Sequence, residues 1–242
     1  MPTTTWFPPA ALDWLLGGCP RVLVLGGGPM LPRLLAERSH EVFWAHPRPR
    51  ALDGCEAVVA AQAEHLPFEP LQFDAVAMHN WLSEIKAGIA LPQIARTLRP
   101  TGRLAVSVLI RDDSVPWVKR LIALLRHFDP LAMAGDYGVD AIEEVRRSNH
   151  YRDLEQRQFR VWRPISRAAM LDLVRDQPLA RRLSPSALDG LLADVGALYD
   201  DSASASEHLK LPFQLVCWRA QAAHDEFTAP LTAPEPGLRI SL

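Results

Sequence analysis

The chain has 242 residues, of which 48% are hydrophobic and 22% are charged, and its formal net charge is −2. This length and composition are those of a globular protein with one large domain, or one domain with a cap. The near-zero net charge gives no electrostatic reason to expect nucleic acid or an anionic membrane as a partner. We therefore expect neither of these two classes of partner.

No apolar run approaches the roughly 18 residues of a transmembrane helix. The N-terminus lacks the basic and apolar regions of a signal peptide. The three cysteines (Cys19, Cys55 and Cys217) are odd in number and lack the paired spacing of a metal site. Buried thiols in a reducing compartment are the simplest interpretation. These features predict a cytoplasmic enzyme or binding protein without a bound metal.

The N-terminal part predicts a helix, a strand and a glycine turn. Apolar residues at helical spacing over 10–16 end at two glycines, as a helix does. Val22–Leu25 is continuously apolar, which is typical of a strand buried on both faces of a parallel sheet. The glycines that follow let the backbone turn sharply and approach a ligand closely: Gly26, Gly27 and Gly28. A helical pattern begins at Leu31, so the turn joins a strand to a helix, where open α/β sheets bind nucleotide-like ligands.

Four more strands are predicted before residue 111. They lie at 41–45, 57–61, 73–78 and 103–110, and a helical pattern covers 85–98. Strands that alternate with helices favour a parallel sheet with right-handed crossovers. The expected fold is α/β, with a doubly wound, Rossmann-like, mainly parallel seven-stranded sheet.

The second half predicts a cap and a late strand. We expect helices at 117–127, 166–176 and 184–199, a loop-rich region at 128–151, and strands at 158–163 and 209–220. The last strand is expected to be an antiparallel strand at the sheet edge. The predicted domain covers 1–220, with an insert or cap at about 111–163 that would build the acceptor pocket. The segment 221–242 is Pro- and Ala-rich and is expected to be a mobile tail.

Several sequence strings together carry a family likeness. They are Val22–Gly28, Ala63–Val76, Gln93–Leu104 and Arg111–Trp117. These strings are similar to V-L-D-L-G-x-G-x-G, A-E-x-L-P-F-x-x-x-x-F-D-x-V, E-x-x-R-V-L-R-P-G-G-x-L and R-D-x-x-x-P-W, in this order. The chain thus resembles the class I S-adenosylmethionine-dependent methyltransferases, and within them the type 11 group, over roughly residues 10–220.

The resemblance implies S-adenosylmethionine as cofactor and a set of residues that contact it. The glycine turn, Gly26, Gly27 and Gly28, would lie beside the amino-acid portion. His46 falls where the family has an acid that binds the ribose, and Gln62, before Ala63, where the family often has an Asp that contacts adenine. His79 follows the fourth strand, where the acceptor would sit. Val24, Met30 and His46 depart from the family pattern, so the cofactor motif is degenerate.

Individual side chains leave alternatives open. His79 is a candidate general base, or a residue that only packs and forms hydrogen bonds. Trp81 would line the acceptor pocket or belong to the core. The resemblance implies that Asp74 chiefly orients its strand.

The predicted function is methyl transfer from S-adenosylmethionine to a small-molecule acceptor. The alternative is a catalytically inactive, methyltransferase-like binding or regulatory protein, and a third reading places another nucleotide-like ligand in the same crevice. A dinucleotide oxidoreductase is disfavoured, because it would need a glycine at Leu31 and an acid near His46. The acceptor and the oligomeric state are not predicted by the sequence.

Overall fold

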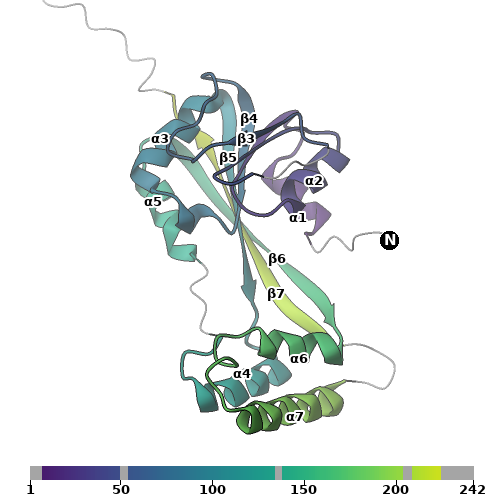
Figure 1. Cartoon of the computed structure of the whole chain (residues 1–242). Coiled ribbons are helices and arrows are strands. Elements are labelled where there is room, and N and C mark those ends of the chain that lie inside the picture. The colour runs from purple at the N-terminus through teal and green to yellow at the C-terminus, as the bar shows by residue number, and fades with distance from the viewer. Residues whose placement is uncertain (1–6, 50–53, 134–137, 204–208, 225–242) are drawn as a thin grey trace, which may run out of the picture.

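The computed structural model describes residues 7–49, 54–133, 138–203 and 209–224. Seven strands are found: β1 (Arg21–Leu25), β2 (Glu41–His46), β3 (Ala57–Ala60), β4 (Phe73–His79), β5 (Leu98–Arg111), β6 (Tyr151–Ile165) and β7 (Leu209–Ala222). They form one sheet in the order β3-β2-β1-β4-β5-β7-β6 (Figure 1). Strands β1 to β5 pair in parallel, and β7 pairs antiparallel with both β5 and β6. The expected doubly wound, mainly parallel sheet is confirmed. The last strand, β7, is antiparallel as expected, but it lies between β5 and β6 rather than at the sheet edge, which β6 occupies.

The centre of the sheet is buried on both faces. The side chains of Val22–Leu25 in β1 are at most 2% exposed, as the continuous apolar run predicts. Helices α1 (Pro9–Leu15) and α2 (Met30–Glu37) pack with Val22 and Val24 on one face. Helices α3 (Ala87–Thr97) and α5 (Ile142–Arg147) pack with Leu23 and Leu25 on the other. Alternate residues of one strand thus build two separate core clusters.

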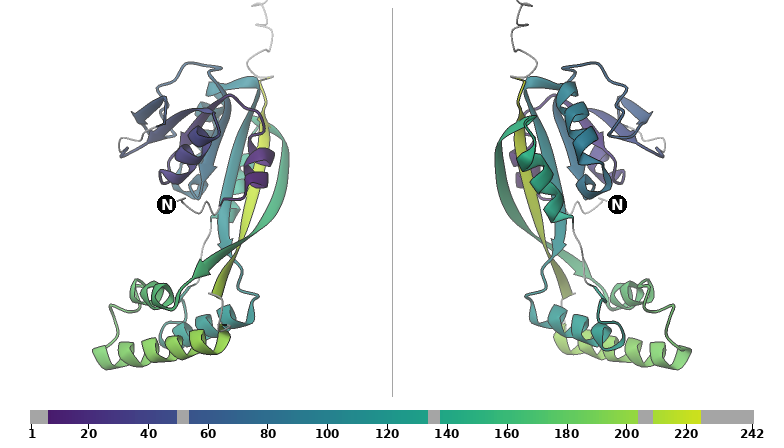
Figure 2. Two further views of the ribbon diagram at one scale, coloured as in Figure 1. Left: turned by 90° about the vertical axis from the view of Figure 1, so that its right-hand side faces the viewer. Right: turned by 90° about the vertical axis from the view of Figure 1, so that its left-hand side faces the viewer.

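Three helices form a second body at the far end of the sheet. Helices α4 (Pro116–Phe128), α6 (Arg167–Arg175) and α7 (Pro185–Ser202) are called here the distal helical unit. Strands β5, β6 and β7 reach it beyond the ends of the other strands (Figures 1 and 2). Its own apolar core includes Val118, Leu121, Met170, Val174 and Val195. None of the helices among the described residues is both long enough and apolar enough to cross a membrane.

The distal helical unit does not coincide with the insert expected at 111–163. That range contains α4, but it also contains α5, which packs with α3 against the sheet, and most of β6. Helices α6 and α7, which lie outside the range, pack with α4 instead. The periodicity of a helix reveals its apolar face, but not which neighbour that face will cover.

Some elements differ in extent from the sequence expectation. Strand β6 has 15 residues rather than the six expected at 158–163, and it pairs with β7 along its length with one irregularity near Arg152. Most of its side chains are exposed, so its sequence lacks the alternation that marks a half-buried strand. Helix α5 lies within the expected loop-rich region 128–151. Residues 221 and 222 of the expected tail belong to β7, and 225–242 lie outside the described residues.

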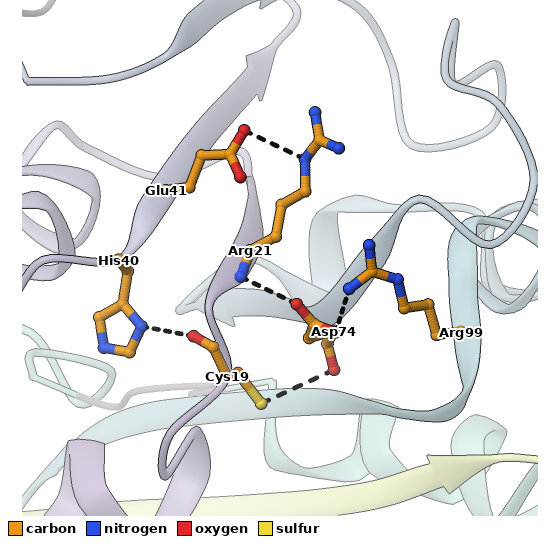
Figure 3. A network of polar contacts seen from close by, with 6 residues as sticks. All are labelled: Cys19, Arg21, His40, Glu41, Asp74 and Arg99. Carbon is orange, nitrogen blue, oxygen red and sulfur yellow. Dashed lines mark hydrogen bonds and ion pairs between the residues drawn. The ribbon is translucent and has the colours of Figure 1, made fainter.

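A polar network joins the amino ends of the strands (Figure 3). The carboxylate of Asp74, in β4, accepts the backbone N–H of Arg21 at 2.9 Å and a guanidinium N–H of Arg99 at 2.5 Å. The same network includes an ion pair between Arg21 and Glu41 at 3.4 Å. Asp74 thus orients β1 and β4 as expected. It does so at the amino ends of the strands, opposite the glycine turn.

Candidate active site

The glycine turn lies at the carboxyl end of β1 and is held by contacts with β2. Gly26 and Gly27 have φ angles of +59° and +65°, a backbone conformation that favours glycine. The N–H of Gly26 donates to the carbonyl of Ala45 at 2.8 Å. The indole N–H of Trp44 donates to the carbonyl of Gly26 at 3.0 Å, and this hydrogen bond is buried. The turn therefore has a fixed conformation before α2 begins.

A small cavity lies against the turn. It has a volume of about 70 Å³ and is lined by Val24, Gly26, Gly27, Gly28, Met30, Leu31 and His79. We call it the glycine cavity. The structure thus brings together the predicted glycines and His79, at the carboxyl ends of the neighbouring strands β1 and β4. Two of the three departures from the family pattern, Val24 and Met30, supply apolar walls to the same space.

A second cavity lies at the carboxyl ends of β2 and β3. It has a volume of about 310 Å³ and is lined by Pro47, Ala60, Ala61, Gln62 and His65. We call it the edge cavity. Gln62 is exposed there, whereas Ala63 is only 7% exposed and belongs to the apolar core. Of these two predicted residues, only Gln62 presents its side chain to a cavity.

His46 ends β2, next to Pro47 of the edge cavity. Its Nδ1 accepts the backbone N–H of Arg48 at 2.9 Å. A neutral imidazole that accepts at Nδ1 carries its proton on Nε2. His46 therefore presents a donor at Nε2, whereas the family's carboxylate at this position presents acceptors.

A directed chain of hydrogen bonds fixes the ring of His79. The backbone N–H of Leu109 donates to Oδ1 of Asn80 at 2.9 Å, so the amide nitrogen of Asn80 faces Nε2 of His79 at 3.2 Å. Since that nitrogen can only donate, Nε2 is the acceptor. The ring proton is then on Nδ1, which contacts the hydroxyl of Ser107 at 2.9 Å. Ser107 in turn donates to the carbonyl of Met78 at 3.4 Å.

Burial keeps His79 neutral. Desolvation lowers the pKa of its imidazole from 6.5 to about 4. The ring of Phe7 packs edge-on against it, with the centroids 5.6 Å apart. A base with a pKa near 4 is poorly matched to proton abstraction near neutral pH.

Trp81, which follows β4, contacts both the glycine turn and His46. A Cβ atom placed on Gly26 would lie 2.0 Å from Cε2 of its indole, so the ring covers the α-carbon of Gly26. The ring centroids of Trp81 and His46 are 5.4 Å apart. Sequence reasoning did not find this contact, nor the contacts of Trp44, Asn80 and Ser107. The only available signal was that Trp44 and Asn80 come close to the carboxyl ends of predicted strands.

The backbone of the glycine turn leaves room for S-adenosylmethionine, but the glycine cavity beside it is too small to hold the cofactor. Gly28 leaves open space where a Cβ would point, and Gly27 has only the carbonyl of His79 nearby, at 3.3 Å. However, about 70 Å³ holds roughly two water molecules, while pockets for small molecules measure about 300–1,000 Å³.

Comparisons with known proteins agree with this fold and site. Residues 25–106 match the methyltransferase domain family. Uncharacterized methyltransferases of Mycobacterium tuberculosis and Mycobacterium bovis are each 30% identical to the chain over 233 residues, which is 90% of this chain and 90% of each relative. A protein from Anaeromyxobacter dehalogenans described as a type II methyltransferase has a similar fold, with a TM-score of 0.65 at 18% identity over 89% of this chain and 96% of that one. The chain belongs to the methyltransferase domain family and is a class I S-adenosylmethionine-dependent methyltransferase.

Proposed function

We propose that this methyltransferase acts on a small-molecule acceptor, and that its cofactor lies along the carboxyl edge of β1, β2 and β3. The observation that carries the proposal is the joint lining of the glycine cavity by Gly26–Gly28 of β1's turn and His79 of β4. This is the region of an open α/β sheet where ligands bind. In this arrangement the glycine turn contacts the amino-acid portion of the cofactor.

The nucleoside portion is assigned to His46 and the edge cavity. The Nε2–H of His46 would donate to a ribose hydroxyl, and the amide of the exposed Gln62 would bind the base. Ala63 contributes through its backbone, since its side chain is buried. A single neutral donor in place of a carboxylate gives up a charge-assisted hydrogen bond, so we expect moderate rather than tight cofactor binding.

His79 is proposed to position the site rather than to remove a proton. Its Nε2 is engaged by Asn80 and its pKa is about 4, so the ring is a weak base at neutral pH. Methyl transfer from a sulfonium is an in-line displacement, in which the acceptor forms a bond to carbon as the carbon–sulfur bond breaks. Such a site favours an acceptor atom that is already nucleophilic at neutral pH, and any acceptor proton leaves to solvent.

That the acceptor is a small molecule is supported by the apolar side chains on the sheet face beyond the glycine cavity. Leu109, Phe159 and Phe213 are half-buried there, on the long strands that lead to the distal helical unit. Half-buried apolar side chains suit a small, partly apolar molecule.

The proposal is tested by calorimetric titration with S-adenosylhomocysteine and S-adenosylmethionine. Gly28→Val is the informative variant, because Gly28 lines the glycine cavity and a Cβ atom placed on it meets no protein atom within 4 Å. Gly18→Val, equally open but outside the site, is the control. We expect micromolar binding by the wild type and the control, and loss of binding in Gly28→Val. Equal binding by all three would refute the assigned cofactor position.

The acceptor is then sought among small molecules with amine, thiol or hydroxyl groups. The measured quantity is S-adenosylhomocysteine released from S-adenosylmethionine with each candidate. Turnover on a protein or nucleic acid but on none of the small molecules would contradict the acceptor class.

A further inference from the structure

Two tryptophans meet the same glycine in different ways. Trp44 is 4% exposed, and its indole N–H is fixed by the hydrogen bond to the carbonyl of Gly26. Trp81 is only half-buried and covers the α-carbon of Gly26 by contact. No hydrogen bond of its indole N–H is found within the described ranges. Trp44 is therefore anchored, whereas the ring of Trp81 can rotate without breaking a hydrogen bond of its own.

The indole of Trp81 contacts residues at or beside both cavities. Gly26 lines the glycine cavity, and His46 precedes Pro47, which lines the edge cavity. Trp81 contacts both Gly26 and His46, so its indole lies between the glycine turn and the end of β2. The glycine cavity alone, about 70 Å³, is below the range of small-molecule pockets, and rotation of the indole would free space beside it.

The backbone at Trp81 also suits a side chain that changes position. The preceding residue, Asn80, has a left-handed φ of +49°, and its side chain and backbone bond to β5 through Leu109 and Ser107. Trp81 itself begins the short 3-10 turn η1 (Leu82–Glu84). The strand end is thus held by Asn80, and rotation of the indole leaves those bonds in place.

We propose that Trp81 is the gate of the cofactor site. In the closed position its indole fills the space between Gly26 and His46, and the cofactor binds only after the indole has rotated away. This inference rests on the cofactor position proposed above. A site that is open for only a fraction of the time binds its ligand more weakly by that fraction.

The first test compares the affinity for S-adenosylhomocysteine of the wild type, Trp81→Ala and Trp81→Phe by calorimetry. The control is Trp162→Ala, which removes an indole that is 46% exposed on β6. We expect Trp81→Ala to bind about tenfold more tightly than the wild type, as for a gate that is open about a tenth of the time. Trp81→Phe should be intermediate and Trp162→Ala unchanged.

The outcomes separate the gate from the cofactor position. Binding by Trp81→Ala alone, or tighter binding by it, supports the gate. If the wild type binds and a folded Trp81→Ala binds equally or more weakly, the gate is refuted and the cofactor position stands. If neither protein binds at millimolar ligand, both the cofactor position and the gate are refuted.

A second readout uses the intact chain and does not depend on a stable alanine variant. The fluorescence of Trp81 is obtained as the difference between the wild type and Trp81→Phe, and its quenching by acrylamide is measured with and without S-adenosylhomocysteine. The gate predicts that quenching of Trp81 increases on binding. An unchanged difference signal at saturating ligand would overturn the proposal.

A third readout needs no ligand. Gly26→Ala places a Cβ against the closed indole, at a residue whose φ is already +59°. The melting temperature should fall more in the wild-type background than in Trp81→Ala, where only the backbone strain remains. Equal falls in both backgrounds would mean that the indole does not occupy the closed position in solution.

Discussion

The indole N–H of Trp44 donates to the carbonyl oxygen of Gly26 at 3.0 Å, inside the protein. This one bond ties the end of β2 to the turn that follows β1. It also gives the carbonyl of Gly26 a partner inside the protein, where a buried carbonyl without one is costly.

The first prediction concerns that bond. Trp44→Phe leaves the Gly26 carbonyl unpaired, and we expect the free energy of unfolding in urea to fall by about 1–3 kcal/mol beyond the loss of packing. Trp218→Phe is a matched control, because Trp218 is 2% exposed and its indole N–H has no hydrogen-bond partner in the described part of the chain. The same cost in both variants would show that the Trp44 bond contributes nothing specific.

The second prediction concerns the stability of the fold at acidic pH. The pKa of His79 is lowered from 6.5 to about 4, so the unfolded state takes up a proton first as the pH falls between these values. His79 therefore supports the fold fully above about pH 6.5, and this support is lost as the pH falls toward 4. We expect unfolding free energy to drop by about 2 kcal/mol from pH 7 to pH 5 through this residue.

The check is urea unfolding at both pH values. His79→Asn should remove most of that drop, whereas His127→Gln, at an exposed position of α4, should keep it. A drop that persists unchanged in His79→Asn would assign the acid sensitivity to another group.

The third prediction concerns Asp74, which should affect stability but not cofactor binding. Asp74→Ala leaves the backbone N–H of Arg21 without its acceptor, so we expect a loss of about 1–3 kcal/mol in unfolding free energy. Asp172→Ala breaks an exposed pair with Arg175 and should cost less than about 0.5 kcal/mol. Because Asp74 lies at the amino ends of the strands, its loss should not change affinity for S-adenosylhomocysteine in the folded protein. A selective loss of affinity would contradict this separation.

The fourth prediction ranks the three cysteine thiols by their reactivity in the folded protein. Burial raises the pKa of Cys217 to about 12 and also raises the pKa values of Cys19 and Cys55, but only Cys55 is half-buried. Under native conditions a thiol reagent should modify Cys55 first, and Cys217 only on unfolding. Cys55→Ser should abolish the early phase, and a remaining early phase would show that another thiol is accessible.

How much the sequence predicts depends on how local the cause is. The strand Val22–Leu25 and the turn after it can be predicted from the sequence. A strand buried on both faces must be apolar, and a sharp turn needs residues without a Cβ. The gathering of these glycines with His79 follows from the parallel order of β1 and β4. The position of Trp81 does not follow, because it depends on a side-chain rotamer and on neighbours from two other strands. The role of His79 as an acceptor also needed the orientation of Asn80, which a bond from β5 decides.

The length of β6 has a consequence for how copies of the chain meet. It is the outermost strand on its side of the sheet and is 15 residues long, so one row of its backbone groups faces outward. Such an edge can recruit a strand from another molecule and let sheets grow into aggregates. Here the exposed positions from residue 157 onward carry Arg157, Arg160 and Arg163, while those before it carry Arg152, Asp153 and Glu155. If β6 of a second copy lay alongside β6 of this one, arginines would lie next to arginines. Their repulsion therefore opposes edge-to-edge growth.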